Sequence, residues 1–104
     1  MIAIKIVKKM KMTLKEIVKD RNTKFVDVRT VMEFNTGHIS SALNIPLDQF
    51  HHRYNEIEGL NSTPIVFYCR SGNRSGQAVS YLLQKGIKNI YNGGAMIDLE
   101  YQLN

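Results

Sequence analysis

The chain has 104 residues, one of them a cysteine, with 43% hydrophobic residues, 22% charged residues and a net charge of +5 at pH 7. These values are ordinary for a single globular domain, which we place over residues 1–104, and no apolar run reaches the roughly 18 residues needed to span a bilayer. The lone cysteine excludes a disulfide within the chain, and the N-terminal stretch has no small-residue cleavage site, so we expect a cytoplasmic protein without a membrane partner.

Basic residues are concentrated near the N-terminus. Six of the fourteen lie within the first twenty positions: Lys5, Lys8, Lys9, Lys11, Lys15 and Lys19. No aromatic residue is interleaved with them, and lysines are common on exposed edge strands and helix faces. We therefore interpret them as a solvated basic face and expect no nucleic-acid partner.

Along the chain, short apolar runs alternate with segments of helical spacing. Strands are expected within 4–11 and over 25–28, 43–45, 65–68 and 87–91, helices over 14–20, 31–35, 49–57, 77–85 and 95–103, and a turn at 92–94. Thr13 with Glu16, and Thr30 with Glu33, have the capping-box spacing that marks a helix start. The alternation predicts a compact α/β domain around a mostly parallel sheet.

The only cysteine, Cys69, directly follows the apolar run 65–68. A continuous apolar run that ends in a turn is typical of a buried parallel strand, and a helical pattern that stops at Gly86 comes next. We therefore expect Cys69 at the carboxyl end of a strand, just before a helix N-terminus. In open α/β sheets this is where ligands bind.

The surroundings of Cys69 favour a thiolate over an inert core thiol. A free cysteine titrates near pH ~8.5. Loop amides and a helix N-terminus can stabilise an anion by up to ~2 kcal/mol, and Arg70 and Arg74 add two permanent cations. Because ~1.4 kcal/mol corresponds to one pKa unit, we expect Cys69 to be mostly thiolate at neutral pH. With no second cysteine, any sulfur that it gains must pass to another molecule.

Three segments resemble the single-domain rhodaneses, sulfurtransferases that carry sulfur as a cysteine persulfide. They are DVRTVMEFNTGHISSALNIPL (27–47), CRSGNRS (69–75) and AVSYLLQKGIKNIYNGGAM (78–96). The resemblance implies a rhodanese-like α/β fold with a five-stranded, mostly parallel sheet and short helices on both faces. It also implies that the sulfur of Cys69 is held by a substrate-binding loop formed by Arg70, Ser71, Gly72, Asn73, Arg74 and Ser75.

The implied reaction has two steps. The Cys69 thiolate attacks the outer sulfur of an anionic donor, thiosulfate or a polysulfide, while Arg70 and Arg74 attract that donor. Cyanide or a thiol then takes the sulfur from the persulfide, and a small thiol or a thioredoxin-like protein is the expected cellular acceptor. We expect no cofactor and no metal, since His51 and His52 lack the helical i, i+4 spacing of a metal site.

Three residues outside the loop are expected to support it. Asp27 and Arg29 end a strand near the active edge, where we favour a structural ion pair over a role in the reaction. His38 resembles a family position that stabilises its turn, and a general-base role is the less favoured alternative.

Two other classes of protein remain open. Certain cell-cycle phosphatases and arsenate reductases look similar in fold, but the phosphatases place five residues between cysteine and arginine, whereas four separate Cys69 from Arg74. The shorter loop favours one extra sulfur atom over a tetrahedral phosphate. The second alternative is a non-catalytic rhodanese-like module that carries sulfur or binds a protein. The modules that only bind partners have lost the cysteine that this chain retains.

Overall fold

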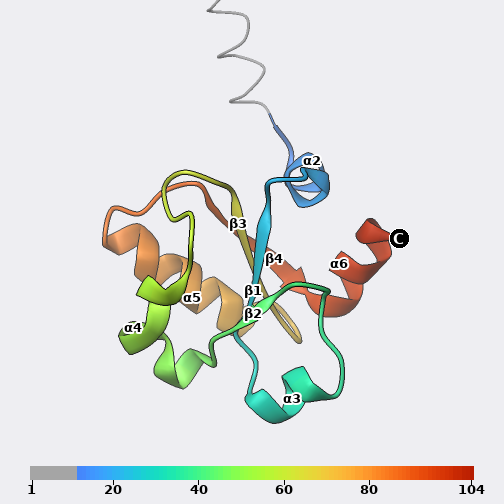
Figure 1. Cartoon of the computed structure of the whole chain (residues 1–104), viewed down its shortest axis with the longest axis horizontal. Coiled ribbons are helices and arrows are strands. Elements are labelled where there is room, and N and C mark those ends of the chain that lie inside the picture. Colours follow the sequence, from blue (N-terminus) through green and yellow to red (C-terminus); the bar gives the residue numbers. More distant parts are fainter. Residues whose placement is uncertain (1–11) are drawn as a thin grey trace, which may run out of the picture.

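The computed structural model describes residues 12–104, in which four parallel strands form one sheet in the order β2-β1-β3-β4 (Figure 1). The strands are β1 (Lys24–Asp27), β2 (Leu43–Asn44), β3 (Ile65–Cys69) and β4 (Ile90–Ala95). The predicted α/β architecture with a parallel sheet is confirmed. The fifth strand, expected within 4–11, lies outside the described residues.

Short helices connect these strands. They are α2 (Leu14–Lys19), α3 (Val31–Asn35), α4 (Phe50–Arg53), α5 (Asn73–Gln84) and α6 (Met96–Leu103), with the 3-10 helices η1 (Leu47–Gln49) and η2 (Tyr54–Glu56) on either side of α4. Both predicted capping boxes are present, at the starts of α2 and α3. The single helix expected over 49–57 is wrong, since short pieces without side-chain caps occupy that region. Between residues 12 and 104, no helix is long and apolar enough to cross a membrane.

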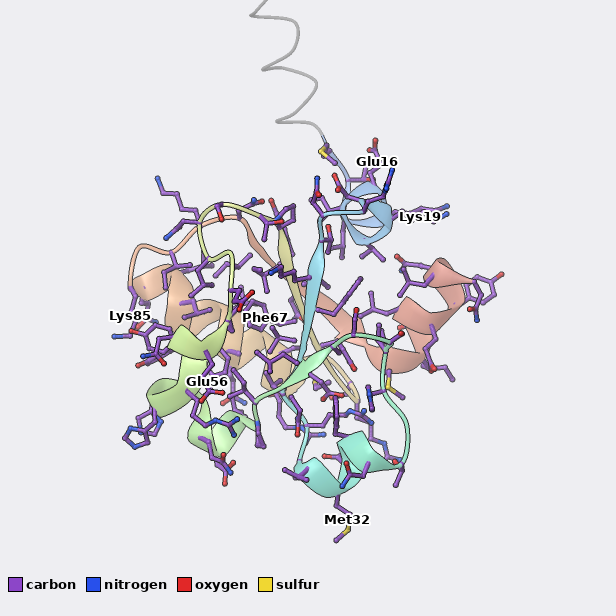
Figure 2. All side chains as sticks on the ribbon, viewed as in Figure 1. Glu16, Lys19, Met32, Glu56, Phe67 and Lys85 are labelled. Carbon is purple, nitrogen blue, oxygen red and sulfur yellow. The ribbon has the colours of Figure 1, made fainter. Side chains whose placement is uncertain are left out.

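The sheet is covered on both faces, as Figure 1 shows, with α4 and α5 on one side and α2 and α6 on the other. Successive side chains of β3 point alternately to the two faces of the sheet. Ile65, Phe67 and Cys69 pack on the face covered by α5, and Figure 2 shows Phe67 at the centre of that core. Val66 and Tyr68 belong to the opposite core. All five side chains are fully buried, so Cys69 is fixed at the end of a rigid central strand.

The turn predicted at 92–94 is wrong, because these residues lie inside β4. Phe67 pairs with Asn92 and Tyr68 pairs with Gly94, so Gly93 is an extra residue that makes a bulge. A Cβ atom on Gly93 would lie 2.6 Å from Cγ1 of Val66, and only glycine fits there. The bulge carries β4 on to the edge of the sheet where Cys69 lies.

Candidate active site

The loop after Cys69 is short because α5 begins at Asn73 and not at the expected residue 77. Gly72 precedes the helix in the left-handed region, with φ of +96°, and no side chain caps the helix start. The sulfur of Cys69 takes the place of such a cap, since it accepts hydrogen bonds from the amide of Ser75, the third residue of α5, and from the Gly72 amide, the latter at 3.0 Å. The sulfur therefore lies where the helix offers unpaired N–H groups.

The thiol of Cys69 is buried, yet donors surround its sulfur. Burial raises the pKa of this thiol, but hydrogen bonds from the hydroxyl and amide of Ser75 and from the amides of Ser71 and Gly72 outweigh burial. The result is a pKa lowered from 9.0 to about 7. A substantial part of the protein therefore carries a thiolate at pH 7.

The two loop arginines have different surroundings. Arg74 donates from Nη1 and Nη2 to the two carboxylate oxygens of Glu33, at 2.7 and 3.0 Å. Glu33 also accepts from the amide and hydroxyl of Thr30 at the start of α3. These bonds, those from Arg74 first, lower the pKa of Glu33 to about 2. Arg74 thus ties the loop to α3, whereas the Arg70 side chain is exposed to solvent.

Asp27, Arg29 and His38 brace the segment around α3. Arg29 donates from Nε and Nη2 to the buried carboxylate of Asp27, at 2.7 to 3.0 Å, and from Nη2 to the carbonyl of Gly37 at 2.7 Å. The hydrogen bond to Asp27 is the main reason why the pKa of Arg29 is raised. The His38 ring stacks on Phe34 with centroids 3.6 Å apart, and its Nδ1 lies 2.8 Å from the Phe34 carbonyl oxygen. These contacts stabilise the chain that carries Glu33.

Asn92 is the site residue that the sequence analysis missed. Its Nδ2 donates to the carbonyl of Gly72 at 3.0 Å, and its Oδ1 accepts from the hydroxyl of Ser75 at 2.7 Å and from the amide of Gly94 at 2.9 Å. It was assigned to a turn because asparagine beside two glycines is a strong turn signal. A bulged strand is the other conformation that such glycines allow, and it would have placed Asn92 at the edge where Cys69 lies.

The fold and the site together define an α/β protein whose parallel sheet presents a buried cysteine within an anion-stabilising loop. Residues 11–95 match the family described as "Rhodanese-like domain". The uncharacterized protein YqhL of Bacillus subtilis is 43% identical over 72 residues, which cover 69% of this chain and 56% of YqhL. The chain therefore belongs to the rhodanese-like domain family, and the resemblance seen in the sequence is confirmed.

Two further similarities bear on function. The tRNA uridine(34) hydroxylase of Pectobacterium atrosepticum is 35% identical over 77 residues, which cover 70% of this chain but only 22% of the hydroxylase. A solved structure described as a rhodanese with anions, from E. coli, superposes with a TM-score of 0.67 at 29% identity and covers 73% of this chain and 89% of its own. The shared part is thus a small fraction of the hydroxylase and most of the E. coli rhodanese.

Proposed function

We propose that this protein is a sulfurtransferase that moves a sulfane sulfur from a small anionic donor, thiosulfate or a polysulfide, to a thiol or cyanide acceptor through a persulfide on Cys69. The observation that carries the proposal is the buried sulfur of Cys69, which several donors surround and whose pKa is about 7. Membership of the rhodanese-like family supports sulfur transfer. The similarity to a rhodanese described with anions supports an anionic donor.

In the first step, a lone pair of the Cys69 thiolate attacks the outer sulfur of thiosulfate. The sulfur–sulfur bond of the donor breaks, sulfite leaves with the bonding electrons, and a persulfide anion remains on Cys69. Charge is conserved without any proton transfer. The amides of Ser71, Gly72 and Ser75, which already bond the thiolate, would hold the new terminal sulfur, with help from the neighbouring amides of the first turn of α5.

In the second step, an acceptor thiolate attacks the terminal sulfur, and the Cys69 thiolate leaves. Both steps are displacements at sulfur with no net change of redox state, so they need no cofactor. The exposed cation of Arg70 would attract the donor, while Arg74 would act through Glu33 to hold the loop. A small thiol or a thioredoxin-like protein suits the acceptor role in the cytoplasm.

Sulfur loading can be measured directly by mass spectrometry of the intact protein after treatment with thiosulfate. We expect a gain of one sulfur atom that a reductant removes, and its absence in Cys69→Ser. Full thiosulfate:cyanide activity in Cys69→Ser would refute the mechanism. A loaded Cys69 that neither cyanide nor any thiol discharges would point to a non-catalytic carrier, and rapid hydrolysis of an aryl phosphate would point to a phosphatase.

A further inference from the structure

We infer that Asn92 is a positioning residue that holds the Cys69 loop in the conformation in which its donors reach the sulfur. The inference deepens the proposed function and rests on it, since a stabilised sulfur anion is what sulfur transfer requires. Asn92 does not contact the sulfur itself. It acts through Gly72, which precedes α5, and Ser75, which lies in the first turn of that helix.

The side chain of Asn92 bonds both Gly72 and Ser75. The Nδ2 of Asn92 donates to the carbonyl of Gly72, and the amide of the same glycine donates to Sγ of Cys69, each at 3.0 Å. The Oδ1 of Asn92 accepts from the Ser75 hydroxyl at 2.7 Å. The amide of Gly94 also donates to this Oδ1, at 2.9 Å, which fixes which atom of the Asn92 amide is the oxygen.

The backbone around Asn92 leaves room for this contact. Gly76 lies inside α5, where glycine is less favourable than alanine. A Cβ atom at Gly76 would lie 3.2 Å from Nδ2 of Asn92, and one at Gly72 would lie 3.1 Å from Cα of Gly94. The two helix-side glycines therefore allow β4 and its asparagine to approach the loop closely.

The hydroxyl of Ser75 has one proton and two acceptors. Its Oγ lies 2.7 Å from Oδ1 of Asn92, an ordinary O–H···O distance, and 3.5 Å from Sγ of Cys69. When Cys69 is a thiolate, the proton can turn to the sulfur, because Oδ1 keeps its bond from the Gly94 amide. Asn92 thus has two opposed effects on the thiolate: it positions Gly72 and Ser75, and it competes for the Ser75 proton.

These effects can be separated by measuring the pKa of Cys69 from the pH dependence of its alkylation by iodoacetamide. In a Ser75→Ala background only the Gly72 contact remains, so adding Asn92→Ala should raise the pKa by about half a unit to one unit. In the wild-type background the rise should be smaller, because the freed hydroxyl turns to the sulfur. An unchanged or lowered pKa in the Ser75→Ala background would overturn the inference.

Two further variants test whether the change in the pKa of Cys69 depends on the side chain at position 92. Asn89→Gly removes an asparagine that precedes β4, has a positive φ and accepts from the Tyr91 hydroxyl, and it should leave the pKa of Cys69 unchanged. If Asn92→Ala does not fold, Asn92→Ser, which is too short to reach Gly72, should give the same rise, and no rise would overturn the inference. Sulfur loading of the wild type is measured separately: its failure would refute the proposed function and leave the effect of Asn92 on the pKa intact.

Discussion

Replacing Glu33 by glutamine tests how α3 supports the cysteine loop. Glu33 has two roles: its carboxylate binds Arg74 through two hydrogen bonds, and it completes the capping box with Thr30. Glutamine is also compatible with a capping box. Glu33→Gln therefore removes the ion pair with Arg74 and leaves the cap in place.

The size of the effect follows from the pKa of Glu33. Hydrogen bonds from Arg74, followed by those from Thr30, lower this pKa from 4.5 to about 2. At full strength the lowering corresponds to about 3 kcal/mol. The side chains of Arg74 and Glu33 are 31% and 30% exposed, so screening by solvent leaves about 1 kcal/mol. We expect Glu33→Gln to lower the free energy of unfolding at neutral pH by about that amount.

The pH dependence supplies a second test. The folded pKa of Glu33 is depressed, so the ionised carboxylate stabilises the fold above pH 4.5, and this contribution is lost as the pH falls towards about 2. Urea unfolding followed by circular dichroism should show the difference between wild type and Glu33→Gln shrinking across that range.

Glu16 provides a matched control for this experiment. It makes the same capping box with Thr13 at the start of α2, where Figure 2 shows it at the protein surface. Glu16→Gln should therefore lower the stability of the protein less than Glu33→Gln does. Equal losses of stability in Glu16→Gln and Glu33→Gln would refute a stabilising contribution from Arg74.

Three further predictions concern the loop. Ser75→Ala should raise the pKa of Cys69 by about one unit and slow the alkylation of this thiol at neutral pH several-fold. The control Ser80→Ala, at an exposed position of α5, should change neither. An unchanged pH profile of alkylation in Ser75→Ala would exclude the hydroxyl as a donor. Because the pKa of Cys69 is lowered from 9.0 to about 7 in the fold, the wild type should gain about 2 kcal/mol of stability over Cys69→Ala as the pH rises from 7 to 9. Parallel unfolding curves across that range would contradict the lowered pKa. Gly72→Ala should lower the free energy of unfolding by more than the ~1 kcal/mol expected for Gly86→Ala. Both glycines have a positive φ, but of the two only Gly72 lies against the backbone of β4. Equal losses of stability in urea unfolding would argue against that close approach.

Local signals in the sequence were sufficient for much of the fold. The threonine–glutamate spacings predicted the starts of α2 and α3, because a capping box is complete within four residues. The apolar run before Cys69 placed it at the end of a central strand, since a parallel strand buried on both faces has no polar alternation. The prediction of anion-stabilising surroundings for the cysteine rested on that position.

Contacts between distant segments could not be predicted in the same way. Asn92 and Gly93 have the local signature of a turn, but Gly93 packs against Val66 and Leu99, and this contact with other elements keeps the segment in the sheet. Arg74 was expected to attract the donor together with Arg70. Its partner Glu33 lies 41 residues earlier, and nothing in the spacing of either residue indicates the pair.

The pairing of Arg74 changes the account of how the loop stabilises an anion. With that guanidinium bonded to Glu33, the low pKa of Cys69 arises mainly from hydrogen bonds that neutral amides and one hydroxyl donate at short range. Such donors are fixed by the backbone and are little affected by salt, whereas the exposed charge of Arg70 is screened by salt. In the reaction that we propose, stabilising the sulfur anion and attracting the donor would therefore be separate tasks. The first would depend on the loop geometry that Asn92 and Glu33 maintain, and the second on charge at the surface.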